Sequence, residues 1–139
     1  MRRKFISALL PVALLAFLGA GSSFVLQQEK DKGIGPVKNL DLDPVNKKLA
    51  DDGKALFTGK CVVCHDLDQK KLGPPLRNIT TARTPEYIMN LLLNSAQMQK
   101  EDIIVKDLIR KYNNLPMTSP GFTMAQARAV LEYLRSVAK

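Results

Sequence analysis

The segment Cys61-Val62-Val63-Cys64-His65 constrains this chain more than any other part of the sequence. The chain has two cysteines and one histidine, so this segment holds all of its thiol and imidazole groups. Two cysteines separated by two residues and followed directly by a histidine form the pattern that attaches a c-type haem. In a helical turn, such a run places both sulfur atoms on one side of the backbone. The motif therefore predicts one covalently attached haem c, bound through Cys61 and Cys64, with His65 as an iron ligand.

Three other interpretations of these residues are weaker. A thioredoxin-like redox site needs an alternating strand–helix–strand pattern, which we do not find in the sequence. A structural zinc site usually has four nitrogen or sulfur ligands, and the two cysteines and the histidine offer only three. A disulfide between Cys61 and Cys64 would leave His65 and the later methionines unexplained. We therefore favour haem attachment.

The first residues of the chain have the features of a secretory signal peptide. Residues 2–4 are basic, residues 5–18 are almost entirely apolar, and residues 19–23 are small. This order predicts a signal peptide over residues 1–21 and export to the periplasm. Apolar residues resume at Phe24, so an uncleaved anchor extending to residue 26 is the alternative, since it approaches the ~20 residues that span a bilayer.

Residues 22–45 are predicted to form a flexible linker. Their polar stretch lacks periodicity, and Gly33, Gly35, Pro36 and Pro44 interrupt the second half of the segment. The remaining residues, 46–139, are enough for one small domain. A domain of this size buries only a marginal core, and a covalently held haem would add a large apolar surface at its centre.

The charge of the chain is basic but moderate. The formal net charge of +8 includes Arg2, Arg3 and Lys4, which the predicted signal peptide would remove. A moderate charge on an exported protein disfavours nucleic acid as a partner. Lysines near the motif could steer an acidic redox partner, or they could simply keep the surface soluble. These lysines are Lys60, Lys70 and Lys71.

The domain is predicted to be all-α. Thr84 caps a helix that has Pro85 at its first position, and Thr123 with Gln126 forms a capping box for the last helix. We find no hairpin signal and no alternating strand, so we expect about four to five helices wrapped round the haem. The helices are expected from residue 44 or 46 to residue 58, from residue 84, over residues 101–112 and from residue 123.

Met117 is the best candidate for the second iron ligand. Met89 and Met98 fall in a predicted helix, where apolar packing is the usual role of methionine, and Met124 lies in the first turn of the last helix. Met117 lies instead in an irregular loop between two helices, which a ligand needs and a packing residue does not. Ligation by histidine and methionine closes the iron to substrates and raises its potential, which suits electron transfer.

In the order and spacing of its motifs, the chain resembles the class I cytochromes c of bacteria that carry a single haem. The likeness covers about residues 49–137. It rests on Gly53-Lys54-Ala55-Leu56-Phe57, Cys61-Val62-Val63-Cys64-His65, Leu72-Gly73-Pro74, Leu115-Pro116-Met117 and Leu131-Glu132-Tyr133-Leu134. The resemblance implies that the first and last helices cross near Gly53, with Phe57 and either Tyr133 or Leu134 in the contact.

The resemblance also implies roles around the haem. The carbonyl of Pro74 would accept a hydrogen bond from Nδ1 of His65 and so fix the tautomer and orientation of the ring. Many relatives have a tryptophan near the start of the middle helix that binds a haem propionate, but Tyr87 occupies the matching position here. The propionate partners are therefore open. Arg77 and Tyr112 are further candidates, with a surface arginine and a core tyrosine as the plain alternatives.

The function implied by the resemblance is electron transfer rather than catalysis. We expect a monomer that moves single electrons between respiratory donor and acceptor proteins through transient contacts. One alternative is a haem-based redox or gas sensor in which Met117 is displaced. Another is a small peroxidase-like enzyme with an open sixth position, but His65 is already used and no second histidine remains for acid–base chemistry.

Overall fold

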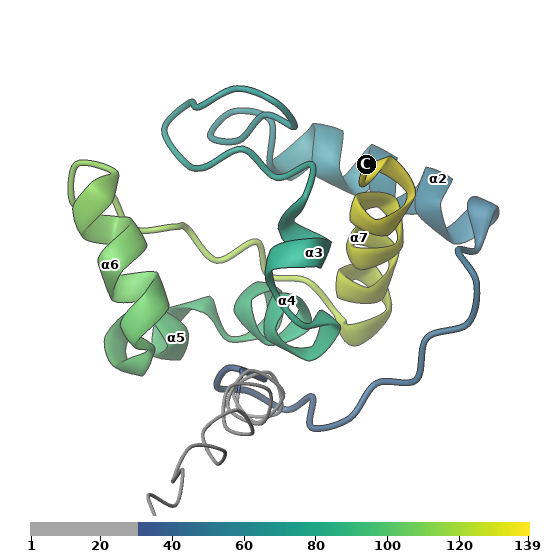
Figure 1. Cartoon of the computed structure of the whole chain (residues 1–139), viewed down its shortest axis with the longest axis horizontal. Coiled ribbons are helices and arrows are strands. Elements are labelled where there is room, and N and C mark those ends of the chain that lie inside the picture. The colour runs from purple at the N-terminus through teal and green to yellow at the C-terminus, as the bar shows by residue number, and fades with distance from the viewer. Residues whose placement is uncertain (1–30) are drawn as a thin grey trace, which may run out of the picture.

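A computed structural model describes residues 31–139 of the chain, and over this range the secondary structure consists of helices without strands (Figure 1). The prediction of an all-α domain is confirmed. The predicted signal peptide and residues 22–30 of the predicted linker lie outside the described residues. The helices are α2 (Lys47–Lys60), α3 (Ile79–Ala82), α4 (Pro85–Leu93), α5 (Ser95–Glu101), α6 (Ile103–Lys111) and α7 (Met124–Val137).

The described part of the chain has more helices than predicted, for two reasons. The short helix α3 has no periodic apolar pattern from which to predict it. The predicted middle helix is divided at Asn94, which ends α4 and precedes α5. The predicted caps are present, since the side chain of Thr84 accepts a hydrogen bond from the backbone of Tyr87 and Thr123 forms a complete capping box with Gln126. No helix within residues 31–139 is long and apolar enough to cross a membrane.

Helices α2 and α7 cross at Gly53. A β-carbon on Gly53 would overlap the backbone carbonyl of Ala129, so only glycine allows the two helices to approach this closely. Beside the crossing, the rings of Phe57 and Tyr133 are 5.2 Å apart between centroids. The crossing and its aromatic contact are therefore as the sequence resemblance implied, with the ring of Tyr133 tilted against that of Phe57.

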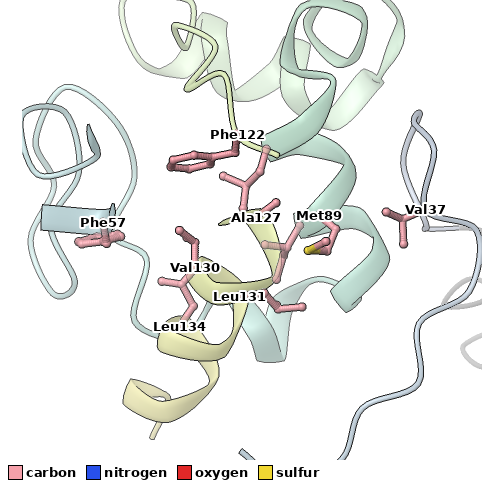
Figure 2. Packing of buried hydrophobic residues seen from close by; sticks show 10 residues of the cluster. Val37, Phe57, Met89, Phe122, Ala127, Val130, Leu131 and Leu134 are labelled. Atoms are coloured by element: carbon pink, nitrogen blue, oxygen red, sulfur yellow. The ribbon is translucent and has the colours of Figure 1, made fainter. Parts of the chain in front are cut away.

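The core lies between α2, α4 and α7 (Figure 2). Helix α7 lies at the centre of this view, with Phe57 of α2 on one side and Met89 of α4 on the other. Burial of an apolar side chain of this size contributes roughly 1.5–3 kcal/mol. The residues of α7 in this apolar cluster are Ala127, Val130, Leu131 and Leu134.

A buried carboxylate ties α7 to the beginning of α2. The side chain of Glu132 has no solvent exposure and accepts hydrogen bonds from Arg128 at 2.8 Å and Arg135 at 2.5 Å. It also accepts a bond from the backbone N–H of Asn46, the residue that caps α2. Hydrogen bonds from three protein donors therefore replace those that the carboxylate would make to water, as a buried charge requires.

The segment before α2 packs against the domain, contrary to the predicted flexible linker for residues 31–45. Val37 is buried in the main core, and its N–H and carbonyl both bond the side chain of Asn90 on α4. The hydroxyl of Thr84 donates a hydrogen bond to the carbonyl of Asp31. We call residues 31–43 the N-terminal strap. Its glycines allow close contact, since a β-carbon on Gly35 would overlap the amide of Asn90.

Candidate functional site

The cysteine motif forms a turn that continues from the end of α2. The N–H of Cys61 donates to the carbonyl of Phe57 at 2.8 Å, and the N–H of His65 donates to the carbonyl of Cys61 at 2.8 Å. Cys64 also donates to Cys61, at 3.1 Å. Both cysteines are half-buried free thiols. The turn therefore holds two unbonded thiols and one imidazole within five consecutive residues.

The surroundings of Cys61 differ from those of the nucleophilic cysteine in a disulfide-exchange site. Burial raises the pKa of the Cys61 thiol, and the neighbouring Cys64 raises it further. A nucleophilic cysteine in a redox motif has a lowered pKa instead, because its thiolate must be stabilised. A raised pKa at Cys61 does not match such a nucleophile.

His65 is oriented by the loop that comes after it. The carbonyl oxygen of Pro74 lies 2.9 Å from Nδ1 of the imidazole, which is the contact that the sequence resemblance implied. A carbonyl oxygen can only accept, so Nδ1 carries the proton and Nε2 keeps its lone pair for a metal. Gly73 packs against the ring, and its own N–H donates to the carbonyl of Cys64 at 2.8 Å. The ring is thus fixed from two sides.

Arg77 closes the loop after His65. Its guanidinium donates to both carboxylate oxygens of Asp68, at 2.5 and 2.7 Å, and to the carbonyl of Val137 at the end of α7, at 3.0 Å. Asp68 in turn keeps its charge easily, because the hydrogen bond from Arg77 lowers its pKa. These bonds tie the loop after the cysteine motif to the end of α7, and the contact of Arg77 with a haem propionate stays a prediction.

The other propionate candidates also have partners within the chain. The hydroxyl of the buried Tyr87 donates to Asp102 at 2.8 Å. Burial and this acceptor raise the pKa of Tyr87 far above its ordinary value, so the phenol remains protonated and the bond persists at high pH. The ring of Tyr112 lies 4.9 Å from Nζ of Lys70, a contact that joins the loop after the cysteine motif to the end of α6.

Met117 lies in the segment that leads from α6 to α7 (Figure 1). Asn113 and Asn114 have positive φ angles of 59° and 56°, and this left-handed pair turns the chain away from α6. The half-buried side chain of Met117 packs against the main core, and its carbonyl accepts a hydrogen bond from Gln99 at 2.8 Å.

The remaining methionines of the described residues are differently placed. Met89 and Met98 are fully buried, and the sulfur of Met98 accepts the N–H of Ile34 from the N-terminal strap at 2.9 Å. Met124 is half-exposed at the start of α7. Met89 and Met98 therefore pack in the interior, as the sequence predicted. Met117 is the methionine that lies in the loop between α6 and α7.

One buried polar atom near Met117 lacks a partner within the described residues. Among the side chains of residues 31–139, the hydroxyl of Ser95 is buried without a hydrogen-bond partner. A buried hydroxyl left unpaired costs about 1–3 kcal/mol. Ser95 begins α5, and its carbonyl shares the donor Gln99 with Met117. The paired free thiols, the oriented imidazole and this unpaired hydroxyl together fit a covalently bound haem with iron.

Comparison with known proteins identifies the family. The cytochrome c family model matches residues 50–138, which is most of the chain. The chain therefore belongs to the cytochrome c family, whose members bind haem c covalently and transfer electrons through it. It is similar to bacterial class I cytochromes c, as the sequence resemblance indicated. No curated protein matches the chain.

Solved structures agree with this assignment. A cytochrome c from Rhodothermus marinus is 43% identical, with a TM-score of 0.72 over 75% of this chain and 90% of that chain. An engineered cytochrome c from the same organism is 42% identical, with a TM-score of 0.71 over the same shares of both chains. The engineered protein bound to a carbene intermediate is also 42% identical, with a TM-score of 0.69, and covers the same shares.

Sequence reasoning missed two parts of this site. Gln99 was not singled out, because its partner Met117 is 18 residues away along the chain. The contact of Gly73 with His65 was also missed, although the glycine belongs to the motif Leu72-Gly73-Pro74. A glycine directly before the residue that orients a metal-binding histidine is a signal that could have revealed this second contact.

Proposed function

We propose that this chain is a periplasmic electron carrier in which His65 and Met117 bind the iron of one haem c. When bound, the haem supplies exchange of a single electron between two oxidation states of its iron. Cys61 and Cys64 hold the group through two thioether bonds, and the carrier moves electrons between respiratory donor and acceptor proteins as a monomer.

The observation that carries this proposal is the 2.9 Å contact between Nδ1 of His65 and the carbonyl of Pro74. With the proton on Nδ1, the lone pair of Nε2 is available to a metal, and His65 follows Cys64 directly in the chain. The usual arrangement for a ligating histidine has its second nitrogen bonded to a carbonyl or carboxylate in this way. The fixed ring also suits electron exchange, because a ligand that keeps its orientation in both oxidation states requires little reorganisation.

Methionine as the second ligand explains the loop that carries Met117. A thioether raises the potential of the iron and fills its sixth position, which favours electron transfer over binding of small molecules. The alternatives of a sensor or a peroxidase-like enzyme need a sixth position that opens. The chain has one histidine in total, so no second imidazole is present to serve as acid–base catalyst.

The surface around the cysteine motif supports brief docking of a redox partner. Val63, between the cysteines, is 75% exposed, and Leu72 in the next loop is 53% exposed. Lys60 is exposed beside them and free to meet an acidic partner, whereas Lys71 bonds the carbonyl of Val62 at 2.8 Å. Small interfaces are typical of transient electron-transfer encounters.

The absorption spectrum of the oxidised protein tests this ligation directly. Protein made in a host competent for cytochrome maturation should show covalent haem and the long-wavelength band of sulfur-to-iron charge transfer. Replacing the half-exposed Met124 by alanine should leave this band unchanged, whereas Met117→Ala should abolish it. A wild-type protein without the band, or rapid binding of carbon monoxide to its reduced form, would contradict the proposed ligation.

The predicted location needs a separate experiment. Fractionation of cells that express the full chain should release the haem protein with the periplasm, and N-terminal sequencing should show cleavage near residue 21. Haem protein that remains with the membranes and retains residues 5–26 would support the uncleaved anchor instead.

A further inference from the structure

The side chain of Gln99 joins two segments that are distant in the sequence. Its amide nitrogen donates to the carbonyl of Ser95 in the same helix at 3.0 Å and to the carbonyl of Met117 at 2.8 Å. A side-chain amide carries two N–H donors, so both are used. Gln99 is half-buried in α5, a helix whose Ser95 and Met98 are buried. The segment around Met117 is thus bonded to a helix that is itself packed into the domain.

The segment that Gln99 holds has few other polar attachments. Within residues 31–139, no backbone–backbone hydrogen bond involves residues 116–121. Gln99 provides the side-chain hydrogen bond that reaches this segment over the described range. Pro116 and Pro120 stiffen the segment but lack an N–H with which to attach it. Among the hydrogen bonds of residues 31–139, the one from Gln99 is therefore the one that holds the Met117 backbone.

We propose that Gln99 is the positioning residue of Met117, and that its hydrogen bond keeps the thioether on the iron. This inference rests on the proposed function, because it assumes that Met117 is the sixth ligand. The buried Ser95 lies on the same face of α5, four residues before Gln99, and its carbonyl accepts the second hydrogen bond of the Gln99 amide. Helix α5 thus holds the segment around Met117 in place through this hydrogen bond.

The first experiment replaces Gln99 by leucine, which keeps a side chain of similar size without the donors. The loss of one hydrogen bond should raise the fraction of molecules with Met117 displaced by about 5- to 10-fold. The rate at which carbon monoxide binds the reduced holoprotein should rise by the same factor, because the gas binds only to molecules in which the ligand has left. The sulfur-to-iron band should weaken in the oxidised protein.

Gln97→Leu is the matched control. Gln97 lies in the same helix, but its exposed side chain bonds only Asn94 and Glu101. This variant should bind carbon monoxide as slowly as wild type. Equal rates for wild type, Gln97→Leu and Gln99→Leu, with normal haem content in all three, would overturn the proposal.

A second variant keeps the test decisive if Gln99→Leu folds poorly. Gln99→Glu preserves the shape but places a carboxylate against two carbonyl oxygens, which raises the pKa of the new carboxyl group. Protonation restores one donor, so the sulfur-to-iron band should be weak at pH 7 and recover as the pH falls toward about 5. A band that is as strong as wild type at pH 7 and does not change with pH would contradict the role of Gln99.

These results separate the inference from the proposed function. If wild type lacks the sulfur-to-iron band, Met117 is not the ligand and the proposed ligation fails. If wild type has the band and the Gln99 variants keep it unchanged, the ligation holds and only the positioning role of Gln99 is wrong.

Discussion

Gly73 lies so close to His65 that a β-carbon at residue 73 would overlap the imidazole ring. Gly73 also donates its N–H to the carbonyl of Cys64. The carbonyl of the next residue, Pro74, accepts a hydrogen bond from Nδ1 of the same ring. The Cys64 and Pro74 contacts and the close packing of Gly73 thus fix the loop and the ring together. The orientation of the imidazole is therefore a property of the backbone of residues 73 and 74, and it is sensitive to a single methyl group.

We predict that Gly73→Ala displaces the ring of His65 and lowers the stability of the holoprotein by about 1–3 kcal/mol, the usual cost of forcing an extra methyl group into a packed site. Thermal unfolding and the absorption spectrum of the haem measure the two effects. Gly59→Ala is the control, because nothing lies within 4 Å of a β-carbon there. Gly59 is in α2, so its replacement should stabilise the protein by up to about 1 kcal/mol. A Gly73→Ala protein as stable as wild type would contradict the argument.

The N-terminal strap should depend on Asn90. The fully buried amide of Asn90 accepts the N–H of Val37 and donates to the carbonyls of Val37 and Lys32. Asn90→Ala leaves these backbone groups without partners and should lower the free energy of unfolding by about 3 kcal/mol. Limited proteolysis should then cut within residues 31–43 faster than in wild type.

Asn39→Ala is the matched control for the strap. Asn39 lies on the strap itself, and its exposed side chain accepts a hydrogen bond from Lys32 alone. The control should resist proteolysis like wild type. Equal cleavage of both variants would show that the strap is held by apolar contacts of Val37 instead of by Asn90.

Glu132 should make the free energy of unfolding of the protein depend on pH. Burial by itself raises the pKa of its carboxyl group, but hydrogen bonds from Arg128 and Arg135 outweigh burial and hold the pKa below its usual value. A carboxyl group with a lower pKa in the folded state stabilises the protein above its unfolded pKa of about 4.3, and this contribution is lost as the pH falls through the folded value. Wild type should therefore lose stability below about pH 4.

Glu132→Gln should remove this part of the acid response. It should also destabilise the protein by about 3 kcal/mol at pH 7, because two arginines lose their buried partner. The free energy of unfolding measured between pH 3 and pH 7 tests both effects. The exposed Glu101, changed to glutamine as the control, should leave the profile unchanged. An identical pH profile for wild type and Glu132→Gln would contradict this role.

Local signals made much of the fold predictable from sequence. Thr84 and Thr123 are followed by residues that complete a helix cap, and the structure has helices at both places. The cysteine motif is equally local, since its three groups are adjacent in the chain. The Gly53 crossing was reached through resemblance, because a glycine in a helix does not by itself reveal which carbonyl it faces.

Contacts between distant residues were less predictable. Gly33 and Gly35 suggested a linker, but they allow the N-terminal strap to pack closely on Met98 and Asn90. Glycine occurs both in flexible linkers and in closely packed segments, and only the residues that pack against it distinguish the two cases. Asn94 divides the predicted middle helix although the apolar spacing continues from Leu91 to Met98, so periodicity alone concealed the break.

Replacing Met117 should change the redox chemistry with little effect on the fold. Met117→Ala removes the thioether that raises the potential, so the reduction potential should fall and carbon monoxide should bind the reduced protein readily. The side chain is half-buried at the edge of the core, so thermal unfolding should change by less than for a core truncation, which costs about 2–5 kcal/mol. Redox titration and gas binding are the measurements, and Met124→Ala is the control because its side chain is 50% exposed at the start of α7. An unchanged potential in Met117→Ala would mean that another group completes the coordination of the iron, since a lost thioether ligand cannot leave the potential as it was.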